Sequence, residues 1–145
     1  MKLTDRLSPR LLAIVDALPL RPGMRVLEIG CGPGAAAREV ARRIGSGHVL
    51  AIDRSRKAIE QAQAACRDEF AAGIITLRQV AAEDFELLPG EEKFDLAFAV
   101  RVGAFDGRHP AAGEKALPRI AAALKPQGRL LIDGGDPLRE LPLQR

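Results

Sequence analysis

The order of its hydrophobic segments is the feature that most constrains how this chain of 145 residues can fold. Short apolar runs bounded by Gly, Pro or charged residues alternate with longer segments of helical periodicity. This alternation is typical of βαβ units, whose right-handed crossovers place helices on both faces of a parallel sheet. The predicted strands are 24–29, 48–52, 74–80, 94–100 and 129–132, and the predicted helices are 9–18, 35–44, 56–72 and 111–124.

We therefore expect an α/β fold, a three-layer αβα sandwich around a doubly wound and mainly parallel sheet. The length suits one domain, residues 1–145. No apolar run approaches the roughly 20 residues of a membrane helix. The first residues carry charge and soon meet Pro9, which does not match a signal peptide, so we expect a cytoplasmic protein.

Composition narrows the classes of partner. The net charge is +3, but Lys and Arg are interleaved with Asp and Glu, and the chain holds five Phe and no Trp or Tyr. A nucleic-acid binder usually carries a basic patch or aromatic stacking faces, so we do not expect nucleic acid as a partner. Cys31 and Cys66 match neither a metal-ligand spacing nor a disulfide framework, so we expect reduced thiols and no metal site.

The predicted topology also places the functional site. In an open parallel sheet, ligands bind beyond the carboxyl ends of the strands, at the point where the strand order reverses. The candidate loops therefore follow Ile29, Ile52, Val80 and Val100.

Two of these strand ends indicate a nucleoside-containing cofactor. The segment Glu28–Gly34 is a Gly-rich turn into a helix, where the backbone can approach a ligand closely and free N–H groups face it. Asp53, about twenty residues further on, can accept hydrogen bonds from both hydroxyls of a ribose. Gly30, Gly32 and Ala35 also satisfy the dinucleotide fingerprint, so these residues leave NAD open.

Four segments together resemble the class I S-adenosylmethionine (SAM) dependent methyltransferases. Val26–Gly34 resembles the first motif of that family, and Ala51–Ser55 resembles the end of its second strand. Phe94–Val100 and Leu124–Ile132 resemble the fourth strand and the turn into the fifth. The resemblance extends over roughly residues 8 to 133.

The resemblance implies a Rossmann-like core of about five strands in the order 3-2-1-4-5, with SAM as the cofactor. The acid at Glu28 would lie near the positive ammonium group of the cofactor, and it argues against NAD because a carboxylate repels a pyrophosphate. Asp53 would hold the ribose. The full cofactor-binding set that we predict is Glu28, Gly30, Cys31, Gly32, Gly34, Asp53, Arg54, Ala82, Glu83, Asp84 and Arg101.

Several of these assignments have alternatives. Ala81 occupies the place where the family often carries an acid for the adenine, so Glu83 or Asp84 would stand in, unless both are solvated loop acids. The stem of Arg54 would pack on adenine. Arg101 would face the cofactor carboxylate, an anionic substrate or solvent. Cys31 would contribute backbone rather than a reactive thiol of lowered pKa.

The family normally has two further strands after the fifth. Here only a short tail follows Ile132, so residues 130–132 would form an apolar edge strand, and such edges are usually covered or paired. We expect either a homodimer through this edge or a tail that folds back over it.

We expect a methyltransferase that acts on a small molecule. Methyl transfer needs alignment of donor and acceptor, and a base only when the acceptor arrives protonated. His109 and Asp106 are the candidate bases, although each also suits a plain loop position. The alternatives are a non-catalytic SAM-binding protein, or a subunit that needs a partner to complete its acceptor site, and thirdly an NAD-dependent oxidoreductase.

Overall fold

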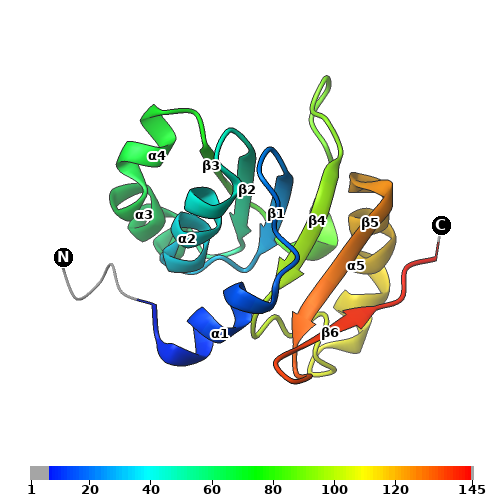
Figure 1. The fold of residues 1–145 in the computed structure, drawn as a ribbon. Helices are drawn as coiled ribbons and strands as arrows, with labels where there is room; N and C mark the ends of the chain where they lie inside the picture. The colour runs from blue at the N-terminus through cyan, green and yellow to red at the C-terminus, as the bar shows by residue number, and fades with distance from the viewer. Residues whose placement is uncertain (1–6, 145) are drawn as a thin grey trace.

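The computed structural model describes residues 7–144, which form a six-stranded sheet in the order β3-β2-β1-β4-β5-β6 (Figure 1). The parallel strands are β1 (Arg25–Ile29), β2 (His48–Asp53), β3 (Ile75–Gln79), β4 (Phe94–Ala99) and β5 (Leu124–Asp133). The sixth strand, β6 (Leu138–Leu141), pairs with β5 in the antiparallel sense. The predicted order of the first five strands is confirmed, and β6 is an addition to it.

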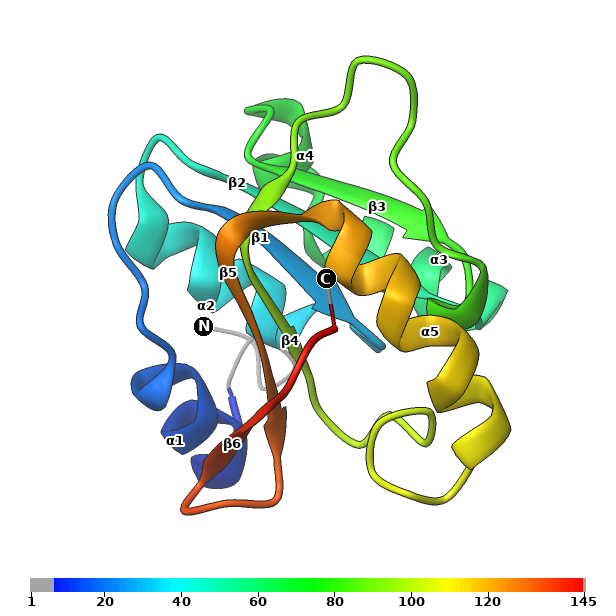
Figure 2. The same cartoon turned by 90° about the vertical axis from the view of Figure 1, so that its right-hand side faces the viewer.

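Helices cover both faces of the sheet, as the alternating pattern predicts. The helices α1 (Pro9–Ala17), α2 (Ala35–Ile44) and α3 (Arg56–Ala65) share one apolar core with the sheet. The helix α5 (Pro110–Ala123) packs on the opposite face, together with the short 3₁₀ turn η2 (Ala82–Asp84). Figure 2 shows α1 and α2 on one side of the sheet and α5 on the other. The expected three-layer αβα arrangement is confirmed.

Successive residues of the central strands supply the two cores alternately. In β1, Val26 packs in the core with α1, α2 and α3, whereas Leu27 packs in the core with α5. Both side chains are fully buried. This explains the nearly continuous apolar sequence of the strands, because a parallel sheet that is covered on both faces has no solvated side.

The helix expected over residues 56–72 is broken. It ends at Ala65, and a second short helix, α4 (Arg67–Ala71), begins after Cys66. Cys66 leaves the helical conformation with φ −101° and ψ 22°, and its thiol lies against the carbonyl oxygen of Gly34 at 3.8 Å. The break places the buried thiol on the turn that precedes α2.

The proline inside α5 does not divide the helix. Pro118 has no N–H to donate to the carbonyl of Glu114, yet α5 runs unbroken for 14 residues. Pro118 and Glu114 are exposed, so water can satisfy that carbonyl. The strand β5 follows α5 directly, and its register against β4 shifts between Phe94 and Leu96, where we expected a separate turn. Within residues 7–144 no helix has the length and apolarity needed to cross a bilayer.

The tail covers the edge that the sequence appeared to leave open. Strand β6 pairs with the apolar stretch of β5, with Leu130 opposite Leu141 and Ile132 opposite Arg139. The new edge strand has only four residues and includes the exposed pair Arg139 and Glu140, features that discourage further pairing. Of our two expectations, the structure has the folded-back tail. The open edge of the fifth strand, on which the expected homodimer depended, is already paired with β6.

Candidate active site

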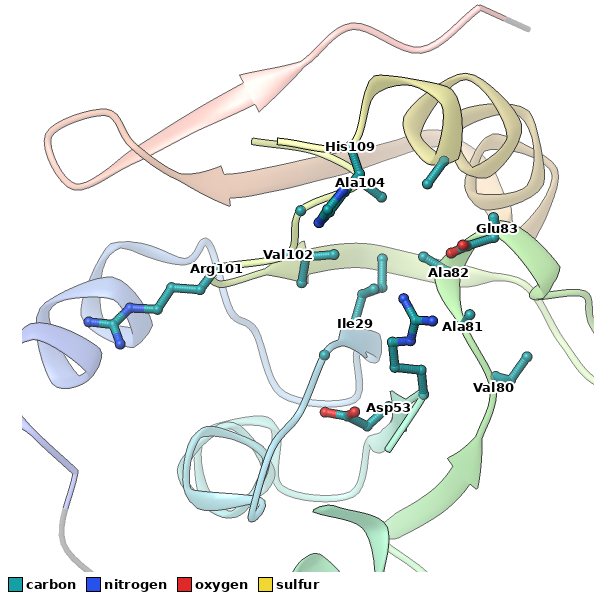
Figure 3. A pocket seen from close by; sticks show the side chains of 14 residues that line it. Ile29, Asp53, Val80, Ala81, Ala82, Glu83, Arg101, Val102, Ala104 and His109 are labelled. Carbon is teal, nitrogen blue, oxygen red and sulfur yellow. The ribbon is translucent and has the colours of Figure 1, made fainter. Parts of the chain in front are cut away.

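A cavity of about 230 Å³ opens at the carboxyl ends of β1, β2, β3 and β4, where the strand order reverses (Figure 3). The first turn of α5 and the loop before it form the opposite wall. This is the position predicted from the topology. The lining residues are Ile29, Gly30, Asp53, Arg54, Val80, Ala81, Ala82, Glu83, Arg101, Val102, Gly103, Ala104, His109 and Ala112.

The Gly-rich turn is tied to β2 by its backbone. The amides of Gly30 and Cys31 both donate to the carbonyl of Ile52, at 2.8 and 2.9 Å. Gly30 has φ +73°, and a Cβ atom there would lie 2.6 Å from Cγ2 of Val102. Glycine is therefore required at this position by both conformation and space. Of the predicted turn residues, Gly30 lines the cavity, whereas Cys31, Gly32 and Gly34 form the rest of the turn outside its wall.

Asp53 ends β2 and lines the cavity, with its carboxylate directed toward the Gly-rich turn (Figure 3). Its Oδ2 accepts a hydrogen bond from the Gly32 amide at 2.9 Å, and its Oδ1 accepts one from the Ser55 amide at 2.9 Å. A carboxylate oxygen has a second lone pair, so each oxygen keeps a site for another donor. The two backbone bonds thus fix the orientation of an acceptor that can still bind two hydroxyls.

Glu28 lies beneath the turn rather than in the cavity wall. It is only 4% exposed, and its Oε1 has no hydrogen-bond partner among residues 7–144. Burial, with repulsion from Asp53 as a smaller cause, raises the pKa of Glu28 to about 8. A buried acid of this kind gains from a nearby positive charge, which would stabilise its ionised form.

The loop after β3 separates Glu83 and Asp84, the two acids that we expected as alternatives for the contact with adenine. Glu83, Ala82 and the residue after β2, Arg54, line the cavity. Asp84 lies outside the lining, and its Oδ1 is 3.2 Å from Nζ of Lys115 on α5. Since η2 turns through these residues, neighbouring side chains leave in different directions. Glu83 is the acid that the structure brings to the cavity.

Arg101 follows β4 in a conformation unusual for its residue type. It has φ +58°, and it is the one non-glycine residue with a positive φ in residues 7–144. Its amide donates to Oδ1 of Asp133 at 3.0 Å, and its carbonyl accepts a bond from Arg108 at 2.8 Å. Figure 3 shows its side chain extending toward α1, away from Asp53. Its guanidinium therefore leaves the part of the cavity where the acids lie.

The two candidate bases occupy different surroundings. His109 precedes α5 and lines the cavity, and its ring lies against Gly103, where a Cβ atom would be 2.3 Å from Cδ2. Asp106 lies outside the cavity lining. Its carboxylate is 2.8 Å from the guanidinium of Arg108, and hydrogen bonding to that group holds the pKa of Asp106 below its usual range. Only His109 of this pair is placed to meet a ligand.

The cysteines have the environment of structural thiols. Burial, with the negative charge of Glu28 as the next cause, raises the pKa of the Cys31 thiol. Burial is also the main reason why the pKa of Cys66 rises to about 11. A thiolate is the reactive form, so neither thiol is activated. Among the residues that the structure describes, no three His, Cys, Asp or Glu side chains form a group able to hold a metal ion.

Much of the cavity wall consists of residues for which the sequence indicated no individual role. Val102, Ala104 and Ala112 line it from the loop after β4 and from α5. These residues have small apolar side chains, and they contribute shape rather than chemistry. The only signal for them was their position after the fourth strand.

Comparison with known families agrees with this geometry. A sequence model described as a methyltransferase domain matches residues 26–128. The match runs from the first strand, across the turn and Asp53, to the start of β5. It therefore covers the strands and loops that form most of the cavity, and more than half of the chain.

Several characterised or solved proteins are similar to the chain. It is 36% identical over 131 residues to protein-L-isoaspartate O-methyltransferase of Methylorubrum extorquens, covering 90% of this chain and 50% of that protein. It is 31% identical to trans-aconitate 2-methyltransferase of Delftia acidovorans, covering 88% and 44%. The structure of a SAM-dependent methyltransferase of Geobacter sulfurreducens, solved with S-adenosyl-L-homocysteine, matches with a TM-score of 0.65 and 26% identity, covering 87% and 48%. The chain spans half or less of the length of these proteins.

Proposed function

The chain belongs to the class I SAM-dependent methyltransferases, and from this premise we propose that it binds SAM in the cavity and transfers its methyl group to a small molecule. The observation that carries the proposal is that a Gly-rich turn after β1 and Asp53 at the end of β2 meet at one cavity. The similarity to methyltransferases that act on different acceptors supports the reaction and leaves the acceptor unidentified.

Asp53 is the residue to which we assign the ribose. Its two oxygens are already oriented by the amides of Gly32 and Ser55, and each retains an acceptor site. Vicinal hydroxyls donate two hydrogen bonds at about the spacing of carboxylate oxygens, so the fit requires no rearrangement of the strand end. Hydrogen bonds to a charged acceptor are among the stronger ones in proteins.

Arg54 and the η2 turn are the residues that would hold the adenine in this proposal. The methylene stem of Arg54 offers an apolar surface on one side, and Ala81 and Ala82 offer a second surface. Glu83 at the same wall is the acceptor for the exocyclic amine, and the Ala82 amide is a further contact. This assignment uses Glu83 rather than Asp84, because Asp84 is engaged by Lys115 outside the cavity.

The buried side chain of Glu28, whose Oε1 has no hydrogen-bond partner among residues 7–144, suits a cofactor with a positive charge. A buried acid with an orphaned oxygen is costly unless a donor or a positive charge compensates it. The ammonium group of SAM would provide that charge. A pyrophosphate at the same place would meet the carboxylate of Asp53 and would oppose the ionisation of Glu28, whereas an ammonium group would favour it, so the charges here favour SAM over NAD.

When bound, SAM would supply a methyl group that its sulfonium activates for transfer. The residues of this chain then have to align the acceptor and exclude water. Val102 and Ala104 provide an apolar wall beside Gly30. His109 is placed to accept, on an imidazole nitrogen, the proton of an acceptor that arrives protonated. Asp106 is a poor base because hydrogen bonding from Arg108 lowers its pKa and therefore its affinity for a proton.

A second candidate function is a non-catalytic SAM-binding protein, or a subunit whose acceptor site a partner completes. It is favoured by the acceptor side of the cavity, where Val102, Ala104 and Ala112 form an apolar wall and His109 is the candidate base. The cofactor assignments above are the same for both functions.

A labelling experiment separates the two functions. The purified protein is incubated with methyl-labelled SAM and, in parallel, with the small-molecule and the macromolecular fractions of a cell extract. We expect label to move to an acceptor in the small-molecule fraction. Saturable binding of S-adenosylhomocysteine without label transfer to either fraction would contradict the proposed enzyme and support the non-catalytic function.

A further inference from the structure

A second cavity adjoins the first on the side of α1. It has a volume of about 170 Å³, and it is lined by Ser8, Arg10, Leu11, Ile14, Val100 and Arg101. Arg101 lines both cavities, so it lies at the boundary between them. A molecule in the second cavity would therefore lie next to the proposed cofactor.

We propose that this second cavity binds the carboxylate of the methyl acceptor, and that the acceptor is a small monocarboxylate with an apolar body. The proposal rests on the proposed function, because it assigns the acceptor of that reaction. It adds the chemical class that neither the family match nor the similar proteins fix for this chain.

The guanidinium of Arg101 is the first reason. It has no hydrogen bond or ion pair within residues 7–144, and it extends toward α1 at the second cavity (Figure 3). The left-handed backbone that aims it there is unfavourable for a non-glycine residue. Asp133 and Arg108 hold this backbone in place through the amide and the carbonyl of Arg101. The surroundings thus fix the backbone of a residue whose exposed side chain carries an unpaired cation to the mouth of a cavity.

The charges around the cavity suit one negative charge. Arg10 is paired with Asp133, whose Oδ2 lies 2.9 Å from the guanidinium and whose side chain is 11% exposed. The charges of Arg10 and Asp133 cancel, so Arg101 leaves the cavity with a net charge of +1. A carboxylate carries one negative charge and matches the planar fork of a guanidinium with two parallel hydrogen bonds.

The floor of the cavity accounts for the apolar body. Ile14 is 1% exposed, and Leu11 and Val100 are partly buried against the same core. An apolar chain on this floor would remove further apolar surface from water. A small inorganic anion would leave the floor uncovered, which favours an amphiphilic ligand.

The test uses hexanoate as the probe and hexanamide as its neutral counterpart. The protein, saturated with S-adenosylhomocysteine, is labelled with ¹⁵N and titrated with each compound while amide resonances are followed. We expect saturable shifts for the amides of Ile14, Val100 and Arg101 with hexanoate, and an affinity for hexanamide at least about tenfold lower. Equal affinity for the two compounds, or no saturable shift, would overturn the proposal.

Three variants test whether the positive charge of Arg101 binds hexanoate. Arg101→Gln should weaken hexanoate about tenfold and leave S-adenosylhomocysteine binding unchanged. Arg101→Gly should weaken hexanoate equally while the fold is retained, because glycine adopts a positive φ freely. Arg56→Gln, which removes the same charge from an 82% exposed side chain on α3, is the matched control and should bind like the wild type. Loss of cofactor rather than hexanoate affinity in Arg101→Gln would assign Arg101 to the cofactor and overturn the proposal.

The titrations with S-adenosylhomocysteine and with hexanoate test the two proposals separately. If S-adenosylhomocysteine binds and hexanoate does not, the cavity assignment fails and the proposed function stands. If S-adenosylhomocysteine does not bind, the proposed function fails, and the acceptor role of the cavity falls with it, whatever hexanoate does.

Discussion

Single residues decide how the cavity would recognise a cofactor, and Asp53 has two tasks there. It accepts the amides of Gly32 and Ser55, which stabilises the turn, and it keeps an acceptor site on each oxygen. The sequence predicted Asp53 from its distance to the Gly-rich turn. The two backbone bonds that orient it depend on the fold and had no signal in the sequence.

Replacing Asp53 with alanine tests the ribose assignment. We expect Asp53→Ala to weaken S-adenosylhomocysteine roughly ten- to a hundredfold, because a hydrogen bond to a charged group contributes about 1.5–3 kcal/mol. Isothermal titration calorimetry measures the affinity, and circular dichroism checks the fold. Asp84→Ala is the control and should bind normally, since Asp84 faces Lys115. Wild-type affinity in Asp53→Ala would remove Asp53 from the site.

Glu28 should give the protein a characteristic dependence of stability on pH. Its pKa is about 8 in the folded state against an ordinary value of 4.5. Between these values the folded state keeps a proton that the unfolded state has released. The free energy of unfolding contributed by Glu28 is therefore full below about pH 4.5 and falls as the pH rises toward 8.

Glu28→Gln should remove this fall. At about 1.4 kcal/mol per pKa unit, we expect the variant to gain roughly 2–5 kcal/mol over the wild type between pH 5 and pH 8.5. Urea unfolding at the two pH values measures the difference. Glu60→Gln, at an exposed side chain on α3, is the control and should track the wild type. Parallel stability curves for Glu28→Gln and the wild type would show that Glu28 is not a buried acid of raised pKa.

At the scale of elements, the sequence predicted regular segments well and contacts between distant segments poorly. The helix expected over residues 9–18 was predicted correctly at its start, where Ser8 accepts the Leu11 amide and caps α1. The break at Cys66 was missed, because it follows from packing against Gly34, 32 residues earlier in the chain. The left-handed Arg101 was missed for a similar reason, since Asp133 and Arg108 impose it.

The sequence did not predict strand β6, although this strand covers the edge of β5. Its four residues have no clear alternation, and their pairing with β5 depends on the turn at 134–137. The pairing leaves Leu130 and Ile132 in the core beside α5. It also supplies the hydrogen bonds that an apolar edge would otherwise offer to another chain.

Deleting residues 134–145 should therefore leave β5 as an unpaired apolar edge strand. We expect the shortened chain to self-associate, and light scattering during size exclusion should give a mass above that of the full chain under the same conditions. Arg139→Ala keeps the backbone of β6 and should behave like the full chain. If the shortened chain has the mass of one chain and stays folded, the covering role of β6 is wrong.

At the scale of the whole molecule, the topology determined the position of the site before any motif was used. Strands β1 and β4 are neighbours whose following helices lie on opposite faces, and the cavity opens between their carboxyl ends. That geometry follows from the alternation of elements and from right-handed crossovers. The acceptor side is less predictable, because its wall is made of small apolar residues and of one arginine whose direction depends on tertiary contacts.

The central claim is that the cavity is a SAM site, and titration calorimetry with S-adenosylhomocysteine tests it most directly, with NADH as the control. We expect one-to-one binding of S-adenosylhomocysteine with a dissociation constant on the order of micromolar, and no measurable heat with NADH. Binding of NADH, or failure of S-adenosylhomocysteine to bind a folded protein, would contradict the claim.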